Sequence, residues 1–356
     1  MTTAAPKKVV TKTTANLQQF TPSKILGTIP YQVSSKITLP KLDRTMMVRS
    51  YNLRLTGSIT TTTTSTSANL GAGDEWGLVT LIELVANGGN VLRSITGEQL
   101  VVLNYLLQGY IKQINTLTGS AGTYAFDSTI PLWMLLPGNI GKALDTTLNT
   151  TLLSDLYIRV TWGTPASINT AAGTTVAATT QIEVSADQAF FLNRAAVPAY
   201  AMVQLQNYQL PNVPPTGAGT AGYPWQVPVG QTYPFWLLNV KNTGTTQDNA
   251  TALGGNLVIQ SGNNQMYNVD LSLEAQMNNF RNFIPFSRFT DFFNNTLDLF
   301  AGWRLIRFVK QQYLSESLNL INFQNCTAYI QNASGVNVDF NLIPLQIFPA
   351  SQVIGQ

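Results

Sequence analysis

Few residues in this chain are of the types that carry out chemistry. Asp74 and Glu75 form its only adjacent acid pair, and paired carboxylates can act as acid and base or bind a divalent cation. Few other acids lie nearby in the sequence, so we interpret the pair as part of a solvated loop. The chain contains no histidine, the commonest general base and metal ligand. The sequence therefore predicts no catalytic residue, no metal site and no cofactor.

Two further signatures of chemistry are weak. Gly217, Gly219 and Gly222 have the spacing of the dinucleotide-binding fingerprint, which works only between a strand and the N-terminus of a helix. Prolines on both sides of these glycines favour a linker instead. The single cysteine, Cys326, cannot form a disulfide within the chain. We expect it to be a small core residue in a strand over residues 325–332.

A stretch between residues 280 and 310 mixes basic and aromatic side chains, which can bind single-stranded nucleic acid. Its basic residues are Arg281, Arg288, Arg304, Arg307 and Lys310. Its aromatic residues are Phe280, Phe283, Phe286, Phe289, Trp303 and Phe308. We favour the alternative, an amphipathic helix and a strand packed at a subunit interface. The predicted interface residues are Arg281, Arg288, Phe289, Phe292 and Phe293.

The composition is typical of a protein that packs against neighbours. Hydrophobic residues make up 44% of the 356 residues and charged residues only 10%, against about a quarter in ordinary soluble domains. Thr, Asn, Gln and Ser supply the polarity instead, which gives a neutral, hydrogen-bonding surface. A weakly charged extracellular β-protein is the alternative that composition alone leaves open.

The first 42 residues are basic, because they carry six lysines and the first acid is Asp43. Such an arm is expected to bind phosphate groups, in nucleic acid or in anionic lipid. The alternative interpretation is a disordered solubilising tail. Apolar residues predict that its second half docks on protein: Phe20, Ile25, Leu26, Ile29 and Tyr31. The lysines are Lys7, Lys8, Lys12, Lys24, Lys36 and Lys41.

Neither a secretory signal nor a membrane span is expected. The apolar run between Lys8 and Lys12 is too short for the core of a signal peptide. No stretch approaches the roughly 18 apolar residues that a spanning helix needs. The sequence therefore predicts a protein that is not integral to a membrane.

The elements that position these residues occur twice. Residues 76–107 predict a strand, a turn, a strand, a polar cap and an amphipathic helix, and residues 257–283 predict the same order. In the first copy the Asn87–Asn90 turn suits a tight hairpin, and Thr96 caps the helix with Gln99 as its capping-box partner. In the second copy we expect Ser272 to be the cap. The equivalent landmarks are 176 residues apart: Asn87 and Asn263, Thr96 and Ser272, and Glu98 and Glu274.

Alternating or continuous apolar residues predict further strands. They cover residues 47–59, 130–136, 156–162, 181–192, 233–240, 303–309, 327–330 and 336–342. A second helix with an aromatic face is expected from Ser287 to Phe300. Thr-rich tracts at 60–67 and 243–251 predict loops, and the prolines and glycines of 207–228 predict a linker. The sequence therefore predicts an all-β protein made of two tandem units.

This tandem resembles the double jelly-roll major capsid proteins of tailless icosahedral viruses, especially membrane-containing bacteriophages, in the adenovirus-like lineage. The resemblance rests on the repeated unit, which is Val79–Leu107 in the first copy and Leu257–Phe283 in the second. It also rests on Phe126–Pro137, on Asp155–Trp162 and on the basic arm. It implies two eight-stranded jelly rolls with short inserted helices. The expected boundaries are an arm at 1–45, a first roll at 46–206, a linker at 207–228, a second roll at 229–350 and a tail at 351–356.

The resemblance also implies a function. Three chains would form a pseudo-hexagonal capsomer of an icosahedral virion, after synthesis in the host cytoplasm. The arm, with Lys7, Lys8, Lys12 and Lys24, would face inward to a membrane or to neighbouring capsomers. The implied partners are further copies, minor capsid proteins and vertex proteins, with an internal lipid membrane as a further candidate and without a specific nucleic acid. The resemblance implies no catalytic residues.

Two other functions compete with this one. A virion spike or a carbohydrate-binding tandem β-sandwich would need surface aromatics in loops, for which Trp225 and Trp236 are candidates. An enzyme such as a glycoside hydrolase would need two carboxylates in one cleft. The sparse acids and the absence of histidine make an enzyme the weakest of the three.

Overall fold

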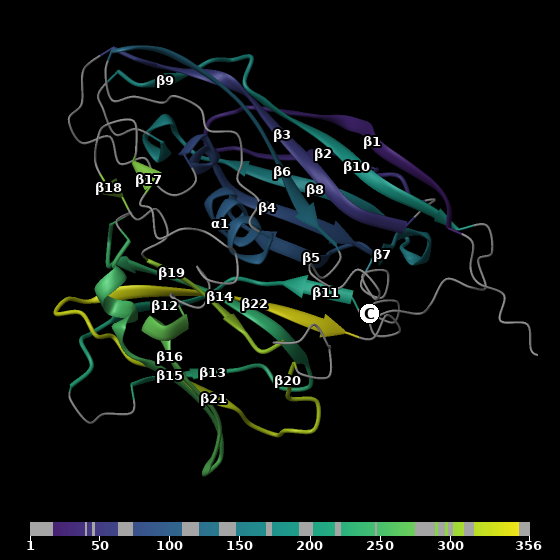
Figure 1. Cartoon of the computed structure of the whole chain (residues 1–356). Helices are drawn as coiled ribbons and strands as arrows, with labels where there is room; N and C mark the ends of the chain where they lie inside the picture. Colours follow the sequence, from purple (N-terminus) through teal and green to yellow (C-terminus); the bar gives the residue numbers. More distant parts are fainter. Residues whose placement is uncertain are drawn as a thin grey trace, which may run out of the picture.

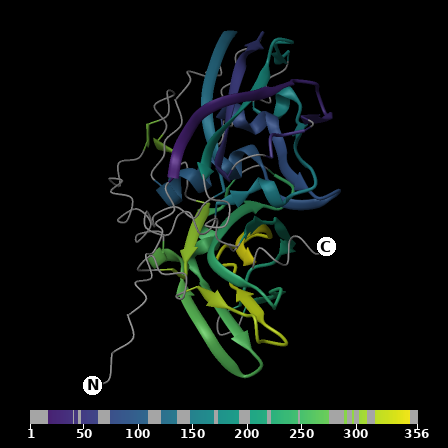
Figure 2. The same cartoon turned by 90° about the vertical axis from the view of Figure 1, so that its right-hand side faces the viewer.

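The computed structural model describes most of the chain, and its ribbon divides into two β-rich halves packed one above the other (Figure 1). The same division is visible after a 90° turn (Figure 2). The described residues are 17–39, 41–44, 47–62, 74–108, 121–134, 147–168, 173–191, 202–217, 222–245, 248–274, 289–290, 296–297, 302–309 and 317–348.

The outer sheet of the first half has the strand order β1–β10–β3–β6, and β7 and β9 also pair with β3. Its four main strands are antiparallel to their neighbours. The strands are β1 (Leu17–Pro30), β10 (Gln181–Phe191), β3 (Met47–Thr61), β6 (Gly122–Trp133), β7 (Leu148–Asn149) and β9 (Thr175–Val176).

A ten-stranded sheet runs through both halves, with eight strands in the order β19–β14–β22–β11–β5–β4–β8–β2. The first half supplies β5 (Asn90–Ile95), β4 (Val79–Ala86), β8 (Leu156–Trp162) and β2 (Lys36–Leu39). The second half supplies β19 (Trp303–Arg307), β14 (Thr232–Asn242), β22 (Val338–Phe348), β12 (Tyr208–Val213) and β20 (Leu318–Asn319). Between them, β11 (Met202–Leu205) is antiparallel to β22 and parallel to β5.

The second half is closed by a four-stranded sheet in the order β13–β21–β15–β16. Its strands are β13 (Tyr223–Gln226), β21 (Thr327–Ile330), β15 (Asn256–Ser261) and β16 (Asn264–Asp270). The short strands β17 (Phe289–Thr290) and β18 (Thr296–Leu297) pair with each other. The described helices are α1 (Gly97–Gln108), the 3-10 turns η1 (Asp74–Leu78), η3 (Thr150–Leu152), η4 (Pro165–Ser167) and η6 (Ala250–Gly254), and the helical residues 271–274.

Period-two burial explains the strands that the sequence predicts. In β3 the side chains of Tyr51, Leu53 and Leu55 are fully buried, whereas Arg54 between them is exposed. β8 alternates without a break, since every second residue from Leu156 to Trp162 is buried. The expected half-buried strands at 47–59 and 156–162 are confirmed, and so is the all-β fold class.

The turn and the helix cap of the first copy form as the sequence predicts. Asn87 and Gly88 take positive φ angles of 50° and 77° in the β4–β5 turn. Thr96 Oγ1 accepts a hydrogen bond from Gln99 N, and Thr96 N donates to Gln99 Oε1. α1 contacts β4, β6 and β19, and residues 100–106 are all buried. The helix is therefore buried around its circumference rather than amphipathic.

The second copy differs at its cap. Asp270 Oδ1 accepts hydrogen bonds from the backbone N–H groups of Ser272 and Leu273 at 2.8 and 3.2 Å, so Asp270 caps the helical residues 271–274. The prediction that Ser272 is the cap was wrong. The helix begins two residues earlier than predicted, so the carboxylate of Asp270 accepts from the free N–H groups of its first turn, and charge makes this hydrogen bond strong.

Three predicted segments differ in the structure. The linker predicted at 207–228 contains β12 and β13, which pair with β22 and β21 of the second half. Pro211 lies within a register shift of β12 and Pro224 lies in the edge strand β13, where proline is tolerated. The arm predicted at 1–45 is part of the first half from β1 onward. A continuous helix from Ser287 to Phe300 is excluded, because Phe289 pairs with Leu297 in an antiparallel ladder; residues eight apart in a helix lie about 12 Å from each other.

The two halves share buried apolar surface. The core of the first half also contains second-half side chains: Phe235, Leu237, Trp303, Leu305, Ile343 and Leu345. A second core lies between the four-stranded sheet and the other face of β14 and β22, around Trp236 and Phe340. Because adjacent residues of β14 point to opposite faces, one strand contributes to both cores. The tandem is therefore joined by a common hydrophobic layer as well as by a common sheet.

Candidate functional site

The described part of the basic arm is built into the first half. β1 pairs with β10 from Leu17 opposite Phe191 to Pro30 opposite Gln181. Ile29 is fully buried, and Leu26 packs against the same core. The expected docking of the arm's second half on protein is confirmed. Lys24 lies in β1 opposite Ala186, whereas Lys7, Lys8 and Lys12 lie outside the described residues.

The first described residues of β1 lie at the same end of the outer sheet as the start of β3. In the ladder, Phe191 of β10 is opposite Leu17, and Ala189 is opposite Met47. β7 also pairs with Met47 and Val48 at this end. Figure 1 shows this end on its right-hand side. Leu17, the first described residue of β1, therefore lies at the same end of the outer sheet as the start of β3.

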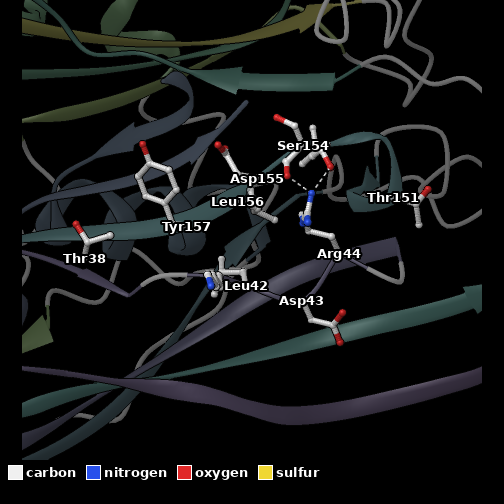
Figure 3. A pocket seen from close by; sticks show the side chains of 11 residues that line it. Thr38, Leu42, Asp43, Arg44, Thr151, Ser154, Asp155, Leu156 and Tyr157 are labelled. Carbon is white, nitrogen blue, oxygen red and sulfur yellow. Dashed lines mark hydrogen bonds between the residues drawn. The ribbon is translucent and has the colours of Figure 1, made fainter. Parts of the chain in front are cut away.

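A pocket of about 860 Å³ opens at the β2–β3 connection (Figure 3). Residues 41–44 form one wall, and η3 with the start of β8 forms the other. Arg44 Nη1 donates to the carbonyl oxygen of Leu153 at 2.7 Å and also to that of Ser154. A guanidinium that binds two carbonyls ties the β2–β3 connection to the segment between η3 and β8.

The opposite wall is tied to the β4–β5 turn. Both carboxylate oxygens of Asp155 accept a hydrogen bond from Gly88 N, at 2.9 and 3.0 Å. Asn87 Oδ1 accepts from Ser154 N at 2.8 Å and from Ser154 Oγ at 3.2 Å. Ser154 therefore faces an amide oxygen rather than a general base, so its hydroxyl is placed for bracing and not for nucleophilic attack.

One member of the acid pair, Glu75, is not solvated. Glu75 lies in η1 with no exposed surface, and Ser128 Oγ donates a hydrogen bond to its Oε1. Trp76 Nε1 donates to the same Ser128 Oγ at 2.9 Å. The interpretation of Asp74 and Glu75 as solvated was wrong for Glu75, because η1 turns its side chain into the core toward β6. Among the described residues, no group of three acids or cysteines is placed to hold a metal ion.

The basic and aromatic stretch is only partly described. Arg281, Arg288, Phe292, Phe293 and Lys310 lie outside the described residues, and Phe289 is in β17. Arg304 Nε donates to Leu271 O at 2.9 Å. Arg307 Nη2 donates to Leu106 O at 2.5 Å, at the C-terminal end of α1. Both described arginines therefore bind carbonyls of the same chain, and Arg307 joins the two halves.

The candidate aromatics of a carbohydrate site lie inside the second half. Trp236 is fully buried in β14, and its ring meets that of Trp225 at 5.4 Å in a T-shaped contact. Trp225 is half-buried in β13 and packs against the second core. Trp236 lies in the strand that the sequence predicts at 233–240, and Trp225 lies in β13, which pairs with β21. Both rings therefore have a packing role, and neither stands in a surface loop as the carbohydrate-binding alternative would need.

A partly buried ion pair joins the halves where the sequence offered no signal. Lys241 Nζ of β14 lies 2.8 Å from Glu98 Oε2 of α1, and the side chains are only 19% and 20% exposed. Asp248 Oδ1 lies 4.0 Å from the same Nζ. Residues 143 positions apart cannot be paired by local spacing. Only the three-dimensional contact of α1 with the second half reveals this cluster.

Cys326 behaves as expected of a core residue. Its side chain is 1% exposed in the second core, and burial raises the pKa of its thiol to about 11. The thiol is therefore protonated at neutral pH and poorly nucleophilic. The described helices include none that is long and apolar enough to cross a membrane.

Comparison with known proteins gives matches in structure alone. No protein-family model matches the sequence, and no curated protein does. The crystal structure of the STIV MCP is 15% identical and superposes with a TM-score of 0.68 over 95% of this chain and 99% of that one. The atomic structure of Sulfolobus turreted icosahedral virus contains a chain with 14% identity and a TM-score of 0.70, covering 93% of this chain and 91% of that one.

A third match comes from a bacteriophage. The major capsid protein P2 of bacteriophage PM2 is 14% identical, with a TM-score of 0.52 over 92% of this chain and 97% of that one. These structural neighbours are major capsid proteins of icosahedral viruses. At such identities the likeness establishes the fold, and it extends over both halves of the chain. This chain therefore has the double jelly-roll fold of these major capsid proteins.

Proposed function

We propose that this chain is the major capsid protein of an icosahedral virus and that three copies form a pseudo-hexagonal capsomer. The supporting observation is the likeness to capsid proteins over more than nine-tenths of this chain, which includes both jelly rolls and the sheet that joins them. A trimer of such chains presents six rolls around its axis, and three identical subunits form a closed ring by simple rotation.

The joined rolls suit this role. They share a ten-stranded sheet and a hydrophobic core, so each chain is a stiff block rather than two domains on a tether. The rolls also differ among the described residues, because the outer sheet of the first contains the fourteen-residue strand β1. A sixfold outline built from two kinds of edge can therefore make two kinds of contact with its neighbours.

The arm is proposed to face inward, where it contacts a membrane or neighbouring capsomers. Its lysines support this, since Lys7, Lys8 and Lys12 precede the first described residue of β1 and carry charge that attracts phosphate groups. Further partners in the virion are minor capsid and vertex proteins, and synthesis takes place in the host cytoplasm. Arg281, Arg288, Phe289, Phe292 and Phe293 are the proposed residues of the subunit interface.

The proposal is tested by negative-stain imaging of the purified full-length chain, combined with glycan-array binding. We expect class averages with a pseudo-hexagonal outline and no glycan binding. A stable monomer that binds a glycan would instead support a spike or a carbohydrate-binding module. Substitution of Phe289 by Asp, with exposed Val33→Asp as the matched control, tests the interface: only the former should abolish the hexagonal particle.

A further inference from the structure

Three partly buried charged groups meet where α1 of the first roll contacts the end of β14 in the second. Glu98 lies in the first turn of α1, and Lys241 lies near the end of β14. Their charged atoms are 2.8 Å apart. Asp248, whose backbone bridges to that of Lys241, brings a second carboxylate to 4.0 Å from the same ammonium. The cluster therefore holds two acids and one base.

The Asp248 side chain is held in one position from several sides. Trp303 Nε1 donates to its Oδ2 at 3.0 Å, and Asn239 Nδ2 donates to its Oδ1 at 3.2 Å. Gly302 lies against it so closely that an added Cβ would come within 2.6 Å of Asp248 Cβ. The carboxylate cannot swing out to solvent without breaking these contacts.

Burial raises the pKa of Asp248 to about 6, while Lys241 opposes the rise and Glu98 adds to it. The remaining described charges near these elements are engaged elsewhere. Asp339, opposite Lys241 in β22, accepts hydrogen bonds from Asn212 N and Thr243 Oγ1. Arg304 of β19 donates to the carbonyls of Leu271 and Trp303.

We propose that Glu98, Lys241 and Asp248 form a proton-sensitive joint between the two jelly rolls. When Asp248 takes up a proton from solvent, its carboxylate becomes a neutral acid and Lys241 is left paired with Glu98 alone. The two acids then no longer compete for one ammonium, and the charge that burial penalises is removed. Mild acid therefore strengthens the contact between α1 and β14.

The direction of the pH effect follows from linkage. Asp248 has a higher pKa in the folded chain than an ordinary aspartate has in an unfolded one. The folded state consequently binds the proton more tightly, so this group favours folding at low pH. That contribution is lost as the pH rises through about 6. This inference concerns the chain itself and holds whether or not the protein assembles into capsids.

The test is thermal unfolding of the full-length protein between pH 7.5 and 5.0, with wild type compared with Asp248→Asn. We expect the Tm difference between wild type and the variant to stay constant above about pH 6 and wild type to gain about 2–4 °C over the variant as the pH falls from there to 5.0. Asp127→Asn is the matched control. Asp127 pairs with Arg54 on the surface, and this hydrogen bond lowers the pKa of Asp127. The Tm difference between Asp127→Asn and wild type should therefore not change over this pH range.

Glu98→Gln provides a second readout that does not require Asp248→Asn to fold. Removal of the Glu98 charge takes away a repulsion that raises the pKa of Asp248. The inflection in the pH profile of Tm should therefore move to lower pH than in wild type. A difference between wild type and Asp248→Asn that does not change with pH, or an inflection that stays in place in Glu98→Gln, would overturn the proposal.

Discussion

At the scale of single residues, the first roll contains polar groups with opposite energetic roles. Arg93 is 2% exposed; its Nη1 donates to Leu92 O at 2.7 Å, and its Nε lacks a partner among the described residues. Burial lowers the pKa of its guanidinium to about 9. Asn104, by contrast, is 1% exposed, and both polar atoms of its side-chain amide have partners. Its Nδ2 donates to Leu100 O and Pro131 O, and its Oδ1 accepts from Trp133 Nε1.

Arg93→Met should be stabilising by about 1–3 kcal/mol at pH 7, because an apolar side chain of similar length avoids the cost of burying an unpaired charge. The folded-state pKa is lowered, so the cost is present below pH 9 and declines as the pH rises toward the unfolded value. The gain should therefore shrink between pH 7 and 10 in denaturant titrations. A loss of stability in Arg93→Met would contradict this account.

Asn104→Leu should cost about 2–4 kcal/mol, since it leaves the Pro131 carbonyl and the Trp133 N–H unpaired in the interior. Urea unfolding of the two proteins measures the difference. Asn268→Leu serves as the control, because Asn268 is an exposed residue of β16 and its substitution should change stability by less than about 0.5 kcal/mol. Equal effects of the two substitutions would show that the buried amide is not important.

At the scale of elements, the N-terminal caps of the two helices in the repeated unit differ in how well the sequence predicts them. The pair Thr96 and Gln99 satisfies the capping-box pattern, and the structure places both reciprocal bonds. Ser272 occupies the equivalent position 176 residues later, yet Asp270 makes the cap. The local sequence pattern alone does not distinguish Asp270 from Ser272, because either side chain can accept a hydrogen bond at the start of a helix.

Thr96→Ala should cost about 1 kcal/mol of stability, because the N-terminal N–H of Gln99 loses its side-chain acceptor. Ser272→Ala is the matched control and should cost only a few tenths of that amount, whereas Asp270→Ala should match Thr96→Ala. Thermal unfolding of the three variants measures all three effects. A larger loss in Ser272→Ala than in Asp270→Ala would contradict the assignment of the cap.

How far a feature can be predicted from the sequence depends on how far apart in the sequence its residues lie. Period-two and turn signals are local, and they predicted β3, β4, β8 and the β4–β5 turn. Pairing between distant segments is not local, so β12 and β13 were taken for a linker and Glu75 for a solvated residue. The contacts that unite the rolls, Glu98 with Lys241 and Arg307 with Leu106, leave no periodic trace in the sequence.

At the scale of the whole molecule, the arm and the body are separated at Leu17. β1 contributes fourteen residues to the outer sheet, and it contacts β10 along its length. The lysines at 7, 8 and 12 precede this strand. A cut before Leu17 therefore removes three lysines and no described strand, whereas a cut at residue 42 also removes β1 and β2 from the first roll.

Deletion of residues 1–16 should leave the Tm within about 2 °C of wild type and spare the trimer, but should impair shell assembly. Deletion of residues 1–42 should unfold the first roll, because it uncovers the core around Ile29. Thermal unfolding and an assembly assay on both truncated proteins make the comparison. Normal shells from the 1–16 deletion would refute the role of the arm.

The central claim is that this chain is the repeating subunit of a pseudo-hexagonal capsomer, and native mass spectrometry of the purified full-length protein tests it most directly. We expect a single species of three times the chain mass of 38.8 kDa, stable on dilution to nanomolar concentration. A species that remains at 38.8 kDa at micromolar concentration would contradict the claim.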